Sequence, residues 1–404
     1  MENAKTFVCI SNYFKGVDFL IQLKKLGNIV YLVTSDKLRS KPWPHEFIDE
    51  IFYMPGSDTE WNLEHLLLGI ENLMKSNPVD AIVALDDFDV EKATYLRENL
   101  RIDGMGQTTG RYFRDKLAMR MQAENCGIAI PVFSSLFHDA DINAFTENIS
   151  PPWVLKPRSE ASATGIIKIY DKETLWAHIL EMGDNRFKYL VEQFKPGAVY
   201  HCDSLIVNHQ LLFSITSKYL ATPMEITQGG GVFRTANIPY DSEDDIEIKK
   251  INEQVLKGFG LKNGVAHTEF IKCHETGEIY FLETSSRVGG AHITEMVEAA
   301  SNINLWKEWA KIEDALVKKQ EYHLPKIKQE YAGIVLTLSK YEHPDLSDFS
   351  DPEVCFRVPL EYHAGLIVKS KKYARVAELL NEYADRLIAD YTVVVEQNKV
   401  TKLH

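Results

Sequence analysis

The sequence predicts a mixed fold in which a doubly wound α/β domain is followed by α+β regions. Short β-rich runs alternate with helix-patterned stretches over the first hundred residues, and this rhythm is typical of a parallel sheet with helices on both faces. A polar, glycine-rich stretch at residues 101–110 interrupts the rhythm, and closely spaced strand patterns follow it. We therefore place a domain boundary near residue 112.

The N-terminal domain, residues 1–112, contains strand patterns and helix patterns in alternation. The predicted strands are 7–10, 29–33, 51–53 and 81–85, and the predicted helices are 17–26 and 63–75. Ser11 and Asn12 follow the first strand, and Asp86 and Asp87 follow the fourth. Ligands of doubly wound sheets gather at such strand ends, although each position alone is more typical of turn and cap chemistry.

The rest of the chain divides into a strand-rich central region, residues 113–325, and a small C-terminal region, residues 326–404. The central region has helix patterns at 115–126, 246–259 and 293–300 and strand patterns at 153–156, 166–170, 189–194, 200–207 and 211–219. The C-terminal region has strand patterns at 332–338 and 365–369 and a helix pattern at 373–388. We find no chemical motif in the C-terminal region.

Composition excludes several classes of protein. The chain has 404 residues and a net charge of −13, with Lys and Arg spread along it, so a nucleic-acid partner is not expected. No apolar run approaches the ~20 residues that span a bilayer, and the start lacks a signal-peptide pattern, so we expect a cytoplasmic protein without membrane contact. The five cysteines show no zinc or disulfide spacing. A homodimer is compatible with the sequence, which does not fix the oligomeric state.

The most informative segment is an acidic hairpin at residues 265–287. Two β-rich runs flank a three-residue loop that ends in Gly277, a pattern typical of a type I turn followed by a left-handed residue. This loop predicts Glu269 opposite Glu283, with the pairs Ile271 and Phe281 and Cys273 and Ile279 on the same face. Two like charges at about 4.5–5.5 Å need compensation.

Mg²⁺, which proteins bind through one or two carboxylates together with substrate phosphates, would supply that compensation. The sequence leaves three alternatives open: one glutamate is neutralised by Arg287 or a lysine, the register slips by one residue, or the two carboxylates share a proton.

Two more segments suggest a phosphate-binding site. Lys156 ends a buried strand pattern and is followed by a loop of small residues at 159–165, which lets backbone N–H groups approach phosphate oxygens. It is not a Walker A sequence, and such loops are common without ligands. The run Glu192, Gln193 and Phe194 ends another strand pattern, where a backbone edge could bind adenine, although an ordinary strand end is the default.

Arg234 ends a glycine-rich connection at residues 228–234 and is a candidate clamp for a substrate carboxylate. A solvated surface arginine is the alternative. His201, His267 and His292 lie near these segments, and hydrogen-bonded structural histidines are the favoured interpretation.

The order of these features resembles the ATP-grasp superfamily: a lysine-bearing helix, a strand ending in Lys-Pro, a small-residue loop, a Glu-Gln-Phe segment and an acidic hairpin ending in Glu-x-x-x-Arg. It is most similar to the carboxylate–amine ligase branch, which includes amino-acid and dipeptide ligases. The resemblance covers most of the chain. It implies a pre-ATP-grasp domain, a central ATP-grasp fold with a mobile lid at about 150–195, and a small C-terminal α+β region.

The resemblance also implies roles for individual residues. Lys116 and Lys156 match the lysines that contact ATP phosphates, and Arg287 matches the arginine beside the reacting groups, so Lys156 and Arg287 are the expected catalytic residues. The other expected contacts are Ser162 and Gly165 in the loop over the phosphates, Glu192, Gln193 and Phe194 at adenine and ribose, Glu269, Glu283 and Ser285 at the metal, and Arg234, Arg287, Gly289 and Gly290 at the substrate.

Three positions depart from the family pattern. Ser285 stands where the family usually has Asn, the loop has a single glycine, Gly165, and Val199 replaces the usual ribose carboxylate, so that contact falls to Glu192. The implied activity is ATP-dependent amide or peptide bond formation through an acyl phosphate, with ADP and phosphate released. ATP and Mg²⁺ are the implied cofactors. Two Mg²⁺ ions are expected, and Mn²⁺ is the possible substitute. The implied substrates are small carboxylates and amines such as amino acids. The alternatives are biotin-carboxylase-like or formyl-phosphate ligase chemistry and a non-catalytic ATP-sensing module.

Overall fold

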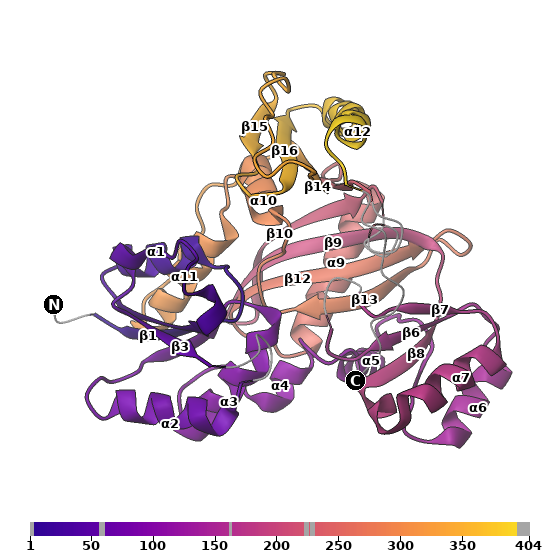
Figure 1. Ribbon diagram of the computed structural model, residues 1–404, viewed down its shortest axis with the longest axis horizontal. Coiled ribbons are helices and arrows are strands. Elements are labelled where there is room, and N and C mark those ends of the chain that lie inside the picture. Colours follow the sequence, from indigo (N-terminus) through magenta and orange to yellow (C-terminus); the bar gives the residue numbers. More distant parts are fainter. Residues whose placement is uncertain (1–3, 56–60, 161–163, 222–225, 227–230, 394–404) are drawn as a thin grey trace.

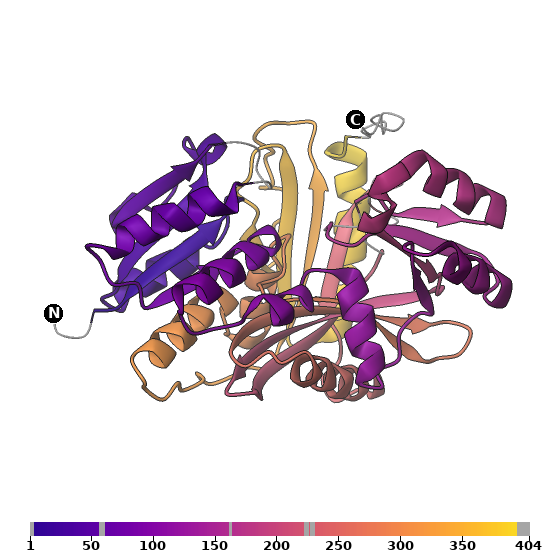
Figure 2. The same cartoon turned by 90° about the horizontal axis from the view of Figure 1, so that it is seen from below.

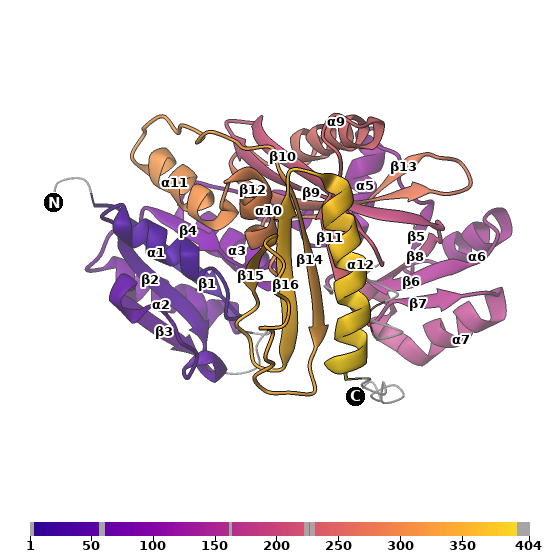
Figure 3. The same cartoon turned by 90° about the horizontal axis from the view of Figure 1, so that it is seen from above.

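The structure, a computed structural model, describes residues 4–55, 61–160, 164–221, 226 and 231–393. Within these residues the strands form three sheets, which Figure 1 shows with the eight-stranded sheet in the middle. The N-terminal sheet and the sheet that contains β6 (Trp153–Pro157) lie at opposite ends of the molecule. Between them lie β14 (Tyr331–Leu338), β16 (His363–Ser370) and α12 (Tyr373–Asp390) (Figures 2 and 3). No helix in the described part of the chain is both long and apolar enough to cross a membrane.

The N-terminal sheet is parallel, with the strand order β3-β2-β1-β4. Its strands are β1 (Thr6–Ser11), β2 (Ile29–Ser35), β3 (Glu50–Met54) and β4 (Ala81–Ala84). Side chains alternate along each strand, so Phe7 and Cys9 pack with α1 (Val17–Lys25), whereas Val8 and Ile10 pack with α2 (Leu63–Met74) and α3 (Val90–Leu100). Helices thus cover both faces, and the predicted doubly wound architecture is confirmed.

A second, antiparallel sheet has the order β5-β8-β6-β7 and is covered by two helices. Its elements are β5 (Phe133–Ser135), α6 (Asp139–Asn148), β6 (Trp153–Pro157), β7 (Ile167–Ile169), α7 (Lys172–Met182) and β8 (Tyr189–Gln193). Trp153 and Leu155 of β6 join the apolar side chains of α6 and α7 in one cluster. Lys156 follows Leu155 directly and, because side chains alternate along a strand, faces the other side, away from that cluster.

The central sheet has eight antiparallel strands in the order β13-β12-β9-β10-β11-β14-β16-β15. Its strands are β9 (Gly197–Val207), β10 (Gln210–Tyr219), β11 (Phe233–Asn237), β12 (Gly264–Cys273), β13 (Ile279–Ser285), β14 (Tyr331–Leu338), β15 (Val354–Arg357) and β16 (His363–Ser370). The associated helices are α5 (Lys116–Asn125), α9 (Glu243–Gly258), α10 (Ile293–Ser301), α11 (Leu305–Val317) and α12 (Tyr373–Asp390).

The strands of the C-terminal region extend this central sheet, because β14 pairs with β11. The division at residues 112 and 325 stays a prediction, and the sheet shows how the parts on either side of 325 are joined. α11 makes a further connection by packing on α1 of the N-terminal domain, where the rings of Trp309 and Phe19 lie 4.9 Å apart.

Several elements were not predicted from the sequence. They include α3, α6, α7, α11, β5, β11 and β15, the short helix α4 (Gln107–Arg111), and the 3-10 turns η1 (Asp36–Leu38), η2 (His45–Phe47), η3 (Asp87–Asp89) and η4 (Gly183–Lys188). Most of these elements are short or weakly amphipathic, so they give a weak periodic signal. α11 is an exception, because its apolar residues recur at helical spacing.

Candidate functional site

The acidic hairpin consists of β12 and β13, and Glu269 pairs with Glu283 as predicted. The pairing nearer the turn was predicted wrongly: Phe281 pairs with Phe270 and Ile279 with Lys272. The turn sets a register one residue shorter than expected, and a bulge beside Glu269 restores the predicted register at the glutamates. Phe281 consequently joins Phe270 in the core on the other face of the sheet.

Glu283 forms an ion pair with Lys116, whose Nζ lies 2.8 Å from its Oε2. The same Nζ donates a hydrogen bond of 2.6 Å to the carbonyl of Glu160 at the start of the small-residue loop. Burial alone would raise the pKa of Glu283, but Lys116 and the more distant Lys156 hold it below its usual range. Lys116 thus lies between the hairpin and the loop, where the resemblance expects an ATP phosphate.

Glu269 accepts a hydrogen bond of 2.8 Å from the hydroxyl of Tyr219, and its Oε1 lies 3.6 Å from Nε2 of His267. Each of the two glutamates thus uses one carboxylate oxygen in these contacts: Oε1 in Glu269 and Oε2 in Glu283. Two carboxylates that face each other from adjacent strands, with a hydroxyl nearby, form an oxygen-rich set of the kind that Mg²⁺ prefers. The residues present therefore fit a magnesium site, and that assignment stays a prediction.

Lys156, Glu192 and Arg120 form a buried charged cluster at the join between β6, β8 and α5. Nζ of Lys156 and Nε of Arg120 each lie 2.6 Å from a different oxygen of Glu192. Burial lowers the pKa of Lys156 to about 8, against the attraction of Glu192. Burial alone would raise the pKa of Glu192, but the two cations hold it below its usual range. The Glu192 carboxylate thus pairs with two buried cations, and its expected contact with ribose stays a prediction.

The Glu-Gln-Phe segment lies at the end of β8. The backbone N–H of Gln193 donates to the carbonyl of Val132 (2.8 Å), and that of Phe194 donates to the carbonyl of Pro152 (3.1 Å). Because these two N–H groups already donate to carbonyls of the protein, a backbone contact with adenine would have to use other backbone groups of the segment. The ring of Phe194 has the ammonium group of Lys168 3.7 Å from its centroid, an arrangement that stabilises a cation at an aromatic face.

The loop at 159–165 lies partly outside the described residues, and the expected contact at Ser162 falls there. Gly165 has a φ of 71°, and a side chain at this position would come within 3.0 Å of the ring of Pro157. Both observations favour glycine. Its expected role at the phosphates stays a prediction.

Arg287 and Ser285 meet a carboxylate from the N-terminal domain. Oδ2 of Asp87 accepts hydrogen bonds from Nε (2.7 Å) and Nη2 of Arg287, and Oδ1 accepts one from the hydroxyl of Ser285. Burial would raise the pKa of Asp87, but Arg287 holds it well below its usual range. The position of Asp87 after the fourth parallel strand was the available signal in the sequence, and turn chemistry was judged more typical there.

Gly289 lies against a buried network of two histidines and one aspartate. Oδ1 of Asp203 lies 2.8 Å from Nδ1 of His267, and Oδ2 lies 2.7 Å from Nδ1 of His201. A side chain at Gly289 would approach His267 to 3.0 Å and Asp203 to 3.1 Å. Burial alone would lower the pKa of His267, but Asp203 raises it to about 9. Both histidines are hydrogen-bonded, as the favoured interpretation expected.

The turn between Gly289 and α10 is strained. Gly290 accepts a hydrogen bond of 3.0 Å from the N–H of Ile293. Ala291 and His292 have φ values of 51° and 61°, a region that residues with side chains adopt at a cost. Such strain clusters at functional sites, so the expected acceptor contact at Gly289 and Gly290 stays a prediction.

Arg234 does not join this group, so its position gives the expected clamp no support, and that role stays a prediction. Thr235, the next residue of β11, contacts His201 on the side of the sheet that carries the glutamates (2.8 Å between Oγ1 and Nε2). Arg234 points to the opposite face, because side chains alternate, and its Nη1 donates to Oδ1 of Asn381 on α12 (2.8 Å).

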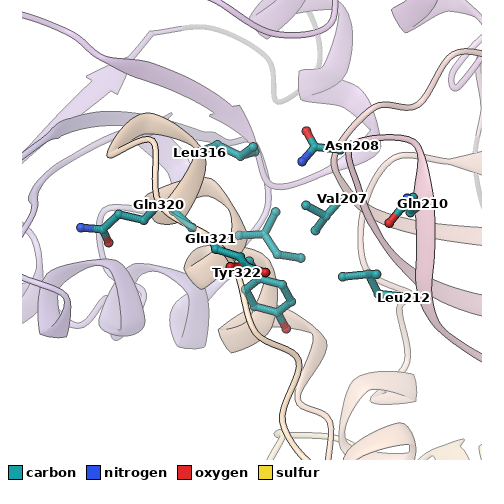
Figure 4. Close-up of a pocket in the computed structure, with 10 residues that line it drawn as sticks. Val207, Asn208, Gln210, Leu212, Leu316, Gln320, Glu321 and Tyr322 are labelled. Atoms are coloured by element: carbon teal, nitrogen blue, oxygen red, sulfur yellow. The ribbon is translucent and has the colours of Figure 1, made fainter.

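A pocket of about 210 Å³ lies elsewhere, between the β9–β10 turn and the end of α11 (Figure 4). Val207, Asn208, Leu316 and Tyr322 are among its lining residues. None of the predicted site residues lines it, so it adds nothing to the candidate site.

No protein-family model matches the chain. Among curated proteins, it is 30% identical over 244 residues to an L-arginine-specific L-amino acid ligase of Bacillus subtilis, a match that covers 58% of each chain. It is 28% identical over 190 residues to a D-alanine–D-alanine ligase of Neisseria gonorrhoeae, covering 46% of this chain and 61% of the relative. The chain thus spans about three fifths of the length of these curated relatives.

Among solved structures, an L-amino acid ligase of Bacillus licheniformis matches with a TM-score of 0.74 and 17% identity, covering 98% of this chain and 100% of that one. At this identity the likeness concerns the fold. The chain has the ATP-grasp fold, and its resemblance to ATP-grasp carboxylate–amine ligases is confirmed.

Proposed function

We propose that this protein is an ATP-dependent carboxylate–amine ligase that forms an amide or peptide bond through an acyl phosphate and releases ADP and phosphate. One observation carries the proposal: Lys116, Glu283 and Arg287 lie at one end of the acidic hairpin, each held by a charged partner. The identity to an amino-acid ligase supports amino acids as substrates.

The proposed chemistry starts with attack of a substrate carboxylate oxygen on the γ-phosphorus of ATP, which breaks the bond to ADP. Lys116 and Lys156 would hold phosphate oxygens, and Arg287 would offset the charge on the transferred group. Glu269 and Glu283, with Ser285, are the residues that would hold Mg²⁺, which neutralises phosphate charge when bound. ATP use, Mg²⁺ and its replacement by Mn²⁺ are parts of the proposal.

In the second half of the reaction an amine attacks the acyl carbon and phosphate leaves. The oxyanion of the tetrahedral intermediate needs a fixed donor, and the guanidinium of Arg287 is the candidate. Exclusion of water protects the acyl phosphate, and we assign that role to the sheet that contains β6 and β8 together with the loop after Lys156.

The alternatives receive less support. Biotin-carboxylase-like and formyl-phosphate chemistry share the fold, but the curated relatives at 28–30% identity are amino-acid ligases. An ATP sensor without turnover would not need Arg287 beside the paired glutamates. A homodimer, the absence of a nucleic-acid partner and a cytoplasmic location stay predictions from composition.

The experiment is an ADP-release assay across amino acids, singly and in pairs, with products identified by mass. We expect ADP release that depends on both substrates, and a product whose mass equals the sum of the two minus water. ATP binding without ADP release for any pair would favour the sensor, and dependence on bicarbonate would favour a carboxylase.

A further inference from the structure

The contact between Asp87 and the end of the acidic hairpin joins residues about 200 positions apart in the sequence. Asp87 begins η3, directly after β4 in the N-terminal domain, whereas Ser285 and Arg287 end the hairpin of the central sheet. The side chains of Asp87 and Arg287 are only 9% and 14% exposed. A charge pair at this depth must be well satisfied, because an unpaired buried charge is costly.

From these contacts we infer that Asp87 is a positioning residue of the proposed ligase: it fixes the orientation of Arg287 and of the Ser285 hydroxyl across the boundary between the two domains. This inference rests on the proposed function.

The hydrogen bonds of Arg287 define what the guanidinium still offers. Nε and Nη2 donate to Asp87, and Nη1 donates to the carbonyl of Val288 at 2.8 Å. A guanidinium has five N–H donors in a rigid fork. Three are thus engaged within the described part of the chain, and the planar fork fixes the directions of the other two. Rotation of the Arg287 side chain would turn these two N–H groups in another direction, and the hydrogen bonds to Asp87 oppose that rotation.

Ser285 needs a positioning partner more than asparagine would. A hydroxyl rotates freely and its proton can point in several directions. Donation to the Asp87 carboxylate fixes the proton, so the lone pairs of Oγ point away from Asp87. In the family pattern an asparagine stands at this position, and its carbonyl oxygen needs no such help. Asp87 therefore compensates for the departure at Ser285.

The other aspartates near Asp87 have partners of their own, so the positioning of Arg287 and Ser285 belongs to Asp87 and not to the acidic run after β4 as a whole. Asp86 pairs with Lys15 and caps η3, and Asp89 accepts the backbone N–H of Asn12 at 2.9 Å. Asp80, at the other end of β4, bonds Lys5 and the backbone of Thr6. Asp80 supplies a matched control, because it is a carboxylate bound to a cation beside the same strand but at the opposite edge of the sheet.

The test compares Asp87→Asn, Asp87→Glu and the control Asp80→Asn with the unaltered protein, using a substrate pair found by the ADP-release screen. We expect Asp87→Asn to lower kcat about 100-fold, the size of effect that a small misplacement of a reacting group produces. KM for ATP should change by less than about threefold, because Asp87 does not bind the nucleotide. Asp87→Glu should recover much of kcat, and Asp80→Asn should match the unaltered protein.

A second readout does not depend on catalysis. The Nε–H resonance of Arg287, identified in ¹⁵N–¹H spectra by its loss in Arg287→Lys, should shift in Asp87→Asn and stay in place in Asp80→Asn. An unchanged resonance would overturn the positioning role even if no substrate pair were found, whereas absence of product with the unaltered protein would count against the proposed function only.

Non-additivity completes the test. If Asp87 acts through Arg287, the double variant Asp87→Asn with Arg287→Lys should be no slower than Arg287→Lys alone. A double variant whose loss of kcat equals the product of the two single losses would overturn the inference. A rise in kcat in Asp87→Asn would also overturn it, because Asp87 would then compete with the substrate for Arg287. Where Asp87→Asn does not fold, Asp87→Glu decides: kcat as low as that of Arg287→Lys overturns the inference, and recovery supports it.

Discussion

Two regions of the central sheet each present an arginine that the sequence marked as a candidate, and the two arginines have different partners. At the edge formed by the acidic hairpin, Arg287 bonds a buried carboxylate from the N-terminal part of the chain. In the interior of the sheet, where α12 packs on β11, Arg234 bonds a neutral amide, Asn381. The residue type is the same, but only Arg287 lies near a second set of charges. A charged partner brought from elsewhere in the fold is therefore the better indicator of a site.

The surroundings of the two arginines extend this contrast. The hairpin edge gathers Glu269, Glu283, Lys116 and the buried aspartate Asp203 on one face of the sheet. The opposite face at β11 packs apolar residues of α12. Fixed charges in a partly buried region interact strongly, and this is the kind of environment that phosphoryl transfer requires. Three predictions test the contrast.

The largest effect is expected at the hairpin. Glu283→Ala should abolish ATP turnover, a loss of more than about 1,000-fold, because it removes a predicted metal ligand and the partner of Lys116. The measurement is ADP release, with folding checked by circular dichroism. Glu275→Ala, an exposed position in the turn of the same hairpin, is the matched control and should keep full activity. Normal ADP release by folded Glu283→Ala would contradict the metal assignment.

A smaller effect is expected from pH. Because burial lowers the pKa of Lys156 to about 8, the charged form that attracts phosphate is lost as pH rises through 8. The value of kcat/KM for ATP should then fall about tenfold per pH unit. Glu192→Gln should move the fall to lower pH, since Glu192 favours the ammonium form.

The control for this profile is Lys172→Met, an exposed lysine on α7, which should leave the pH profile unchanged. Thermal melts of Glu192→Gln are needed beside the kinetics, because the change leaves Arg120 and Lys156 buried with a neutral partner. A profile of the unaltered protein that stays flat through pH 9 would show that Lys156 does not act as a titrating phosphate ligand.

The sequence was sufficient to predict the elements whose pattern is local. α1, α2 and α12 have apolar residues at helical spacing, and the observed ends lie within two residues of those expected. α11 was missed although its apolar residues recur at the same helical spacing, so the signal for it was present in the sequence. β11 and β15 are strands of five and four residues, too short to give a clear periodic pattern.

For the site, the tight turn identified the two strands that carry the glutamates, but the register that it sets would leave Glu269 and Glu283 one residue out of step. The bulge beside Glu269 brings them opposite each other, and it was not predictable because no residue type demands it. Asp87 could be placed at a strand end but not against Arg287, because the sequence does not say how two domains dock. Arg234 could not be placed on either face of the sheet, because the parity of a strand cannot be counted across the glycine-rich connection that precedes it.

The smallest effect is expected at Arg234 itself. Arg234→Ala should leave KM for every substrate within about twofold, because the side chain lies on the face away from the glutamates. It should lower the free energy of unfolding by about 0.5–1.5 kcal/mol, the usual contribution of one hydrogen bond, measured by urea titration. Asn381→Ala should cost a similar amount, and the double variant should cost less than the sum because one bond is shared. A tenfold rise in KM at unchanged stability would place Arg234 at the substrate site and remove the distinction between the two regions of the sheet.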